Sequence, residues 1–154
     1  MSTTIETRLA DLGIVIPEAA APVANYVSHT QSGSLLFTSG QLPLVGGKLV
    51  HTGLLGDGLT IVQGQEAARA AAINVLAQAK AALGDLNRIK RIVKITIFVA
   101  STPDFIEQHL VANGASDLFV AVLGDAGRHV RSAVGTASLP LNAPVEIEAI
   151  IEIA

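Results

Sequence analysis

Residues 60–100, TIVQGQEAARAAAINVLAQAKAALGDLNRIKRIVKITIFVA, predict a long helix that is followed directly by a strand. Thr60 is a suitable N-cap, Gly84 ends the helical pattern, and the sequence between them is rich in alanine. Short apolar side chains recur at helical spacing at Ala67, Ala71, Val75 and Ala79. Small residues on one face allow a helix to pack closely against a sheet.

The strand is predicted over residues 92–100, where apolar and mixed positions alternate. One face would carry Val93, Ile95, Ile97 and Val99, and the other would carry Lys94, Thr96 and Phe98. Alternation with a period of two places successive side chains on opposite faces of a sheet. We therefore expect one buried face and one face of mixed polarity.

Further elements are predicted on both sides of this pair. Residues 27–30 and 34–38 indicate a hairpin, and residues 130–138 and 145–153 indicate two closing strands. Thr102, Pro103 and Asp104 resemble a helix start, which predicts a second long helix as far as about residue 123, with a break at Gly114. Residues 46–58 hold five glycines and are expected to form a loop.

The order of these elements predicts an α+β fold in which one mixed sheet is covered on one face by two long helices. We expect a single domain over residues 1–154, with an N-terminal helical extension at about residues 1–22 that contains a short helix over Ile5, Leu9 and Leu12. The uncovered face of the sheet would carry Lys94, Thr96, Phe98, Arg131 and Glu146. A sheet face that combines polar, charged and apolar side chains is better suited to an interface between subunits than to open solvent.

Composition limits the classes of function. Half of the residues are hydrophobic and 15% are charged, which favours burial against further copies of the same chain. No apolar run reaches the roughly 20 residues of a membrane-spanning helix, and no export signal is expected, so a cytoplasmic location is predicted. With a net charge of −3, one Tyr, four Phe and no Trp, nucleic acid is not an expected partner. Cysteine is absent, which excludes disulfides and thiolate chemistry.

Arg131 is the most informative residue, because it interrupts a strand of small and apolar side chains. Such an arginine either lies on an edge strand or is a buried guanidinium that needs an anion, because burial of an unpaired charge costs a great deal. One interpretation is an ion pair with Glu146 or Glu148 on the next strand. The other is a clamp for the carboxylate of a substrate.

Other candidate motifs carry less weight. Gly53, Gly56 and Gly58 resemble a phosphate-binding loop, but the strand and the Gly-Lys-Ser/Thr of that motif are missing, so a plain loop is favoured. The four histidines, among them His129 two positions before Arg131, have no spacing typical of metal ligands. No metal and no cofactor are expected.

Several short motifs in a fixed order resemble the Rid proteins, the YjgF-type reactive-intermediate imine deaminases that are also labelled L-PSP endoribonucleases. The matching positions are Tyr26, residues 38–43 (TSGQLP), Asp104-Phe105, Asn113, Arg131-Ser132, Leu139-Pro140 and residues 145–149 (VEIEA). Ala133 stands where that branch often has cysteine, and the N-terminal region is longer, so the chain resembles a divergent, longer subgroup.

The resemblance implies a chorismate-mutase-like fold of the bacillus type, assembled as a homotrimer with ligand clefts between subunits. It also implies hydrolysis of enamine or imine intermediates (2-imino acids) to 2-keto acids and ammonia, without cofactor or metal. By position, Arg131 would hold the substrate carboxylate and Glu146 would orient or activate the attacking water. The substrate-binding positions would be Tyr26, Gly40, Asn113 and the backbone of Ala133.

Two other functions stay open at this point. The clefts of a trimer could bind a small carboxylate metabolite without turnover. This function requires Arg131 as a clamp but does not require Glu146 to contact water. The endoribonuclease label is disfavoured by the acidic net charge and the few aromatic residues.

Overall fold

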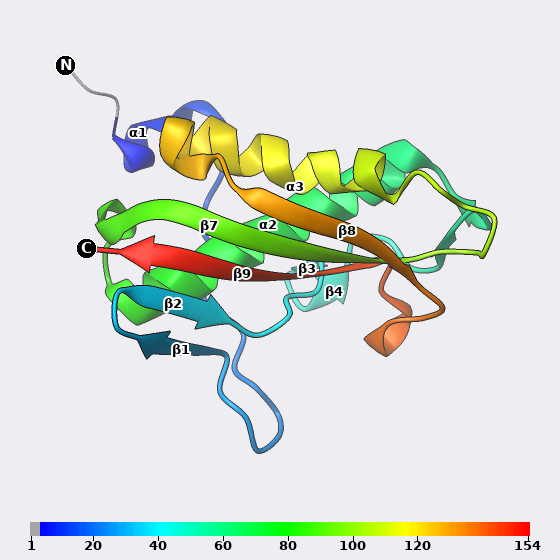
Figure 1. The fold of residues 1–154 in the computed structure, drawn as a ribbon, viewed down its shortest axis with the longest axis horizontal. Helices are drawn as coiled ribbons and strands as arrows, with labels where there is room; N and C mark the ends of the chain where they lie inside the picture. Colours follow the sequence, from blue (N-terminus) through cyan, green and yellow to red (C-terminus); the bar gives the residue numbers. More distant parts are fainter. Residues whose placement is uncertain (1–3) are drawn as a thin grey trace.

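A five-stranded mixed sheet forms the centre of the molecule, as seen in a computed structural model that describes residues 4–154 (Figure 1). Its strands lie in the order β1 (His29–Ser32), β2 (Leu35–Thr38), β9 (Val145–Ile153), β7 (Ile89–Ala100) and β8 (Val130–Thr136). Neighbouring strands are antiparallel except β7 and β8, which are parallel. The predicted α+β class with a mixed sheet is confirmed.

Two long helices, α2 (Ile61–Leu83) and α3 (Gln108–Leu123), cover one face of this sheet, and α2 runs behind β7 and β9 in Figure 1. The predicted ends of α2 are confirmed. Thr60 and Gln63 form a reciprocal capping box, and Gly84 takes the left-handed conformation at the C-cap with φ of 77°. The face that the sequence predicted to be apolar is completely buried: Ala67, Ala71, Val75 and Ala79.

The start of α3 differs from the prediction. The helix begins at Gln108, because the Thr102 hydroxyl donates to the carboxylate of Asp104 at 2.6 Å instead of capping a helix. The backbone N–H of Thr102 is held by the carbonyl of Leu55, a distant contact that the local motif does not reveal. Gly114 does not interrupt α3. A side chain there would collide with the backbone oxygen of Gln65 on α2, so this glycine allows the two helices to approach closely.

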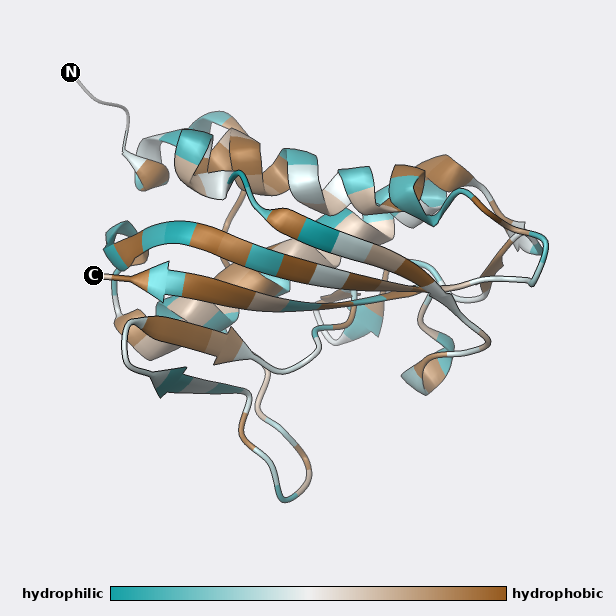
Figure 2. Ribbon diagram, in the orientation of Figure 1, coloured by the Kyte–Doolittle hydropathy of each residue, from teal (hydrophilic) through white to brown (hydrophobic). Residues whose placement is uncertain are grey.

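Strand β7 contains an irregularity that changes the predicted facing of its first residues. The register with β9 shifts between Ile92 and Lys94. Ile92 is therefore buried together with Ile95, whereas Val93, which the alternation predicted to point inward, is half-buried. Beyond the shift the predicted alternation holds, and Figure 2 shows hydrophobic and hydrophilic positions alternating along the strand.

The remaining elements are short. Helix α1 (Ile5–Asp11) is capped by Thr4 and packs against α3, and residues 12–28 contain neither helix nor strand. Short strand pairs lie in and next to the predicted glycine-rich loop: β3 (Leu44–Val45) with β4 (Lys48–Leu49), and β5 (Leu54–Leu55) with β6 (Gly58–Leu59). Three 3-10 turns complete the fold: η1 (Leu86–Arg88), η2 (Gly124–Gly127) and η3 (Pro140–Asn142). Residues 1–3 of the predicted extension lie outside the described residues.

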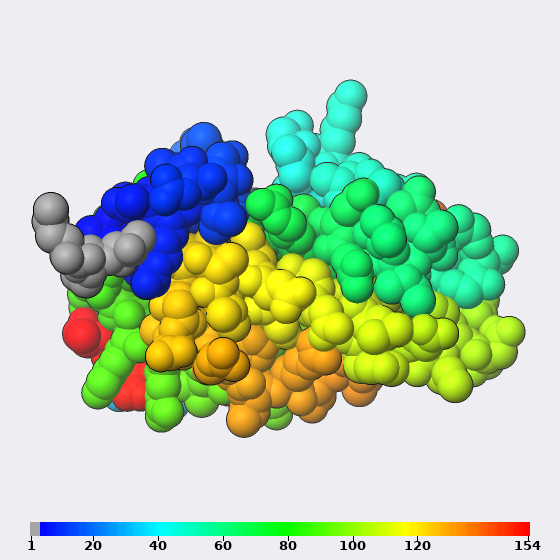
Figure 3. All heavy atoms as spheres, turned by 90° about the horizontal axis from the view of Figure 1, so that it is seen from above, coloured from blue at the N-terminus to red at the C-terminus, as the bar shows by residue number. Residues whose placement is uncertain are grey.

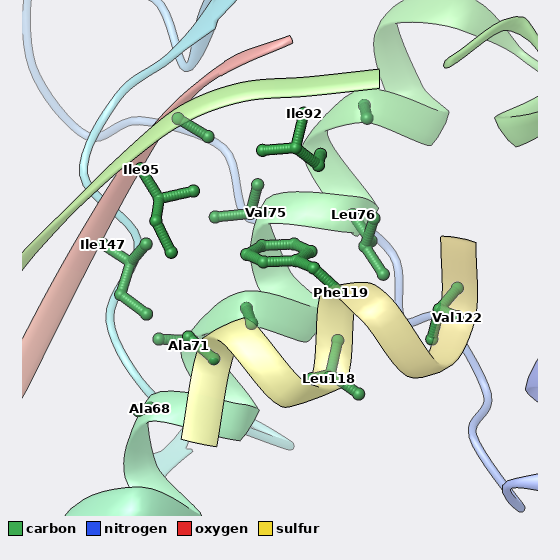
Figure 4. Packing of buried hydrophobic residues seen from close by; sticks show 14 of the residues in the cluster. Ala68, Ala71, Val75, Leu76, Ile92, Ile95, Leu118, Phe119, Val122 and Ile147 are labelled. Atoms are coloured by element: carbon green, nitrogen blue, oxygen red, sulfur yellow. The ribbon is translucent and has the colours of Figure 1, made fainter. Parts of the chain in front are cut away.

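The hydrophobic core fills the space between the sheet and the two helices (Figure 4). Phe119 on α3 is fully buried against Val75 and Leu76 of α2, below Ile92 and Ile95 of the sheet. None of the helices in residues 4–154 is long and apolar enough to cross a membrane.

Candidate functional site

Arg131 lies on the edge strand β8 and is held by α3. Its Nη1 donates to the hydroxyl of Ser116 at 3.0 Å, and its Nη2 donates to the backbone carbonyl of His109 at 3.1 Å. Both acceptors are neutral, and within residues 4–154 no carboxylate lies at ion-pair distance from the guanidinium. The charge of this half-buried side chain is therefore not compensated, which leaves it able to bind an anion.

The predicted ion pair of Arg131 with Glu146 or Glu148 is wrong. The strand that follows β8 in the sequence, β9, is not its neighbour in the sheet, because β7 lies between them. The predicted placement of Arg131 on the uncovered face is wrong as well. Arg131 is paired with Ile95, which is buried beneath the helices, so the arginine projects from the helix side of the sheet.

Two other predicted site residues lie on this same side. Asn113 follows His109 by four positions and precedes Ser116 by three, so all three share one face of α3. Ala133 is two residues beyond Arg131 on β8 and packs, partly buried, against the core. Because β8 is an edge strand of the sheet, one edge of its backbone is available for a ligand or another chain.

Glu146 projects from the opposite, uncovered face of the sheet. It is paired with Phe98 of β7 and is half-buried, between the inward-facing Val145 and Ile147. Burial raises the pKa of this carboxyl above its ordinary value, and the nearby charge of Glu148 adds to the increase. A carboxylate with a raised pKa is suited to accept a proton from water near neutral pH.

Gly40 lies directly against Glu146. A Cβ at this position would collide with the glutamate carboxylate, so the backbone of Gly40 approaches Glu146 more closely than any other residue could. Gly40 and Tyr26 line one pocket of about 470 Å³, together with Ser39 and residues of the N-terminal segment, and Tyr26 is 54% exposed. Arg131 does not line that pocket.

The predicted site residues thus form two groups on opposite faces of one sheet. Arg131, Asn113 and Ala133 lie on the helix side, whereas Glu146 and Gly40 lie on the uncovered side, near Tyr26. One chain alone does not bring the two groups together. The uncovered face also exposes two valines of β8: Val130, 64% exposed beside Lys94, and Val134, 43% exposed beside Phe98. Exposed apolar residues on a sheet face are typical of an interface.

The structure adds three residues that the sequence did not assign to the site: Ser116, His109 through its carbonyl, and His129. His129 contacts Ser116 and the carbonyl of Gly127, and the ring of Phe119 packs edge-on against it at 6.0 Å between centroids. The helical spacing of His109 and Ser116 was a signal for their shared face. Nothing local indicated that this face would meet β8.

Other candidate sites are not supported. In the described part of the chain no three His, Asp or Glu residues are placed to hold a metal ion. Gly53, Gly56 and Gly58 all have positive φ in the turns around β5 and β6, and the capping box of α2 occupies the N–H groups of Thr60 and Gln63. A second hollow of about 420 Å³ lies between residues 13–17, the β3–β4 hairpin and α2 (Figure 3), on the far side of α2 from β8.

Comparison with known proteins gives consistent matches over almost the whole chain. Residues 6–153 match the family model described as "YjgF/chorismate mutase-like, putative endoribonuclease". The chain is 54% identical to Protein TCP17 of Trypanosoma cruzi, over 99% of this chain and 96% of that protein.

Solved structures agree. Atu1372 from Agrobacterium tumefaciens, a protein of unknown function, superposes with a TM-score of 0.92 at 56% identity, covering 97% of this chain and 92% of that chain. TdcF from E. coli, solved with bound serine, superposes with a TM-score of 0.63 at 28% identity, covering 89% of this chain and 94% of that chain.

Proposed function

This chain belongs to the YjgF/chorismate-mutase-like family, and on that premise we propose that it hydrolyses 2-imino acids to 2-keto acids and ammonia in clefts between its own copies. The observation that carries the proposal is the half-buried guanidinium of Arg131, which only neutral oxygens contact in the described residues. A carboxylate would supply the missing negative charge. The serine bound by TdcF is a small carboxylate of this kind.

The opposite faces of Arg131 and Glu146 support a site that two copies of the chain share. In such a cleft, the β8 and α3 side of one copy would face the Gly40 and Glu146 side of the next. The exposed valines of the uncovered face favour the same contact, because their burial would be stabilising. A homotrimer with three such clefts is the assembly that we propose.

The proposed reaction needs little chemical machinery. Arg131 binds the carboxylate, which fixes the neighbouring iminium carbon in the cleft. Glu146 takes a proton from a water molecule, and the oxygen of this water forms a bond to the iminium carbon. Glu146 then passes this proton to the amino group and takes the hydroxyl proton as the C–N bond breaks, so that ammonia leaves and the C=O of the keto acid forms. The Gly40 backbone, Tyr26, Asn113 and the Ala133 backbone would line the cleft.

The first test is to compare turnover with binding. Wild-type protein is expected to release ammonia from freshly generated 2-iminobutyrate and to bind 2-oxobutyrate in calorimetry. Arg131→Ala should lower the affinity by about 30-fold or more, since loss of one partner of a charge pair costs about 2–5 kcal/mol. Arg69→Ala, at an exposed arginine on α2, is the matched control and should change neither quantity. Binding without turnover would instead favour a carboxylate-binding protein.

The second test is to mix two inactive variants. If Arg131 and Glu146 act from different copies, co-refolded Arg131→Ala and Glu146→Gln chains would form some clefts in which both residues are native. If equal amounts of the two variants assemble at random, about a quarter of the clefts combine a native Arg131 with a native Glu146. Activity should therefore return to about a quarter of the wild-type level. Mixed oligomers that stay inactive, although each variant assembles normally, would contradict a shared site.

A further inference from the structure

A continuous chain of hydrogen bonds leads from the backbone to Arg131. Nδ1 of His129 lies 2.6 Å from the carbonyl oxygen of Gly127, and Nε2 of the same ring lies 2.9 Å from the Ser116 hydroxyl. That hydroxyl accepts from Nη1 of Arg131 at 3.0 Å. The chain joins the turn η2, the helix α3 and the strand β8, which pack together at this corner.

The chemistry of the groups fixes the direction of each bond. A carbonyl oxygen can only accept, so Nδ1 of His129 must carry a proton. In the neutral ring Nε2 is then an acceptor, and the Ser116 hydroxyl donates its one hydrogen to it. The lone pairs of the serine oxygen are left for Arg131, whose guanidinium can only donate.

Burial supports the neutral form of the ring. His129 is half-buried, and this burial lowers its pKa below the ordinary value. The hydrogen bond to the Gly127 carbonyl opposes the decrease and the charge of Arg131 adds to it. The Nδ1–H tautomer is therefore the one that the surroundings favour. Phe119, packed edge-on against the ring, restricts its orientation.

We propose that His129 and Ser116 are positioning residues, which hold the Arg131 guanidinium in the orientation that receives the substrate carboxylate. The proposal rests on the proposed function of Arg131 as the carboxylate clamp. Without an acceptor at His129, the hydrogen of the Ser116 hydroxyl would no longer be held away from the guanidinium. The serine oxygen would then be a less constant acceptor for Nη1 of Arg131. Arg131 would keep the carbonyl of His109 as its remaining acceptor and would move more freely.

Paired variants separate this role from simple packing. His129→Phe keeps an aromatic ring against Phe119 but removes both polar atoms, whereas His129→Gln keeps a donor and an acceptor in one side chain. Ser116→Ala removes the hydroxyl and Ser116→Thr keeps it. We expect His129→Phe and Ser116→Ala to weaken 2-oxobutyrate binding about tenfold, and their polar counterparts to restore most of it. His51→Gln, at a histidine paired with Glu66 away from β8, is the matched control.

Nitrogen NMR of the imidazole gives a readout that does not depend on turnover. The ring of His129 should show the neutral Nδ1–H tautomer at pH 7, and its Nε2 signal should shift in Ser116→Ala. A charged ring or the opposite tautomer would overturn the proposal. It would also fail if His129→Phe bound 2-oxobutyrate like the wild type while Arg131→Ala did not bind, although the clamp function would then stand. Wild-type protein that binds no 2-keto acid would overturn both.

Discussion

The carboxylate of Glu146 occupies the space into which any side chain at Gly40 would project. The two residues are more than a hundred positions apart, and the sheet brings them together because the backbone of Gln41 is paired with that of Ile147. A distant side chain therefore leaves no room for a Cβ here, while the backbone conformation of Gly40 itself has φ outside the positive range. The contact fixes where the glutamate can lie.

A Gly40→Ala substitution should reduce activity more than stability. The new methyl group would displace the Glu146 carboxylate, which lies at the end of a flexible side chain, so the fold can adapt. We expect ammonia release to fall at least tenfold, while the thermal unfolding temperature changes little. Gly33→Ala, at a turn glycine of positive φ with open space around it, should lower stability but leave activity unchanged. Full activity in Gly40→Ala would argue against a role for the Glu146 position.

Glu146→Gln should stabilise the protein and abolish turnover. The folded state raises the pKa of this carboxyl, so the folded chain binds the proton more tightly than the unfolded chain does. Stability is therefore lost as the pH rises from the ordinary carboxyl pKa through the raised pKa of Glu146. At pH 7 the charged carboxylate lowers the free energy of unfolding. Removal of the charge should increase the free energy of unfolding at pH 7, and the gain should shrink toward pH 4.

Urea denaturation at the two pH values measures this effect. Glu18→Gln, at an exposed glutamate, is the control and should show no such gain. A Glu146→Gln variant that is less stable than the wild type at pH 7 would contradict the interpretation.

Val134→Lys should prevent assembly without unfolding the chain. Val134 lies on the uncovered face of the edge strand β8 and is 43% exposed in the single chain. A charge buried in an interface is costly, so size-exclusion chromatography should show a smaller species with an unchanged circular dichroism spectrum and no turnover. Val15→Lys, at a more exposed valine of the N-terminal segment, should assemble normally. An active oligomer of Val134→Lys would exclude this face from the cleft.

Gly114→Ala should destabilise the fold, although alanine favours helices. The added Cβ would meet the backbone oxygen of Gln65, and a backbone atom in α2 cannot move without shifting the helix. Overpacking of this kind costs about 1–3 kcal/mol, which exceeds the gain in helix propensity of about 1 kcal/mol. Chemical denaturation should show the loss. Asp117→Ala, at an exposed position of the same helix, should not be destabilised in this way.

Local patterns predicted the elements well where local contacts decide them. Helix α2 begins after Thr60 and ends before Gly84, as predicted, because caps satisfy backbone groups within one turn of the chain. The alternation in β9 likewise holds from Val145 to Ile153, since that strand has a regular period of two. The predicted start of α3 is wrong, because the Thr102 hydroxyl bonds to Asp104 and its N–H bonds to the distant carbonyl of Leu55.

The sequence by itself determined which residues could carry the chemistry: an arginine within an apolar strand, and a glutamate in an alternating one. Only the tertiary structure decided that they lie on opposite faces. The strand order places β7 between β8 and β9, which removes the expected ion pair. At the sheet edge a long side chain such as Arg131 can turn beneath the helix layer and reach Ser116, while Val130 and Val134 face outward. Strand order and edge position depend on how distant segments pack, and no local pattern encodes them.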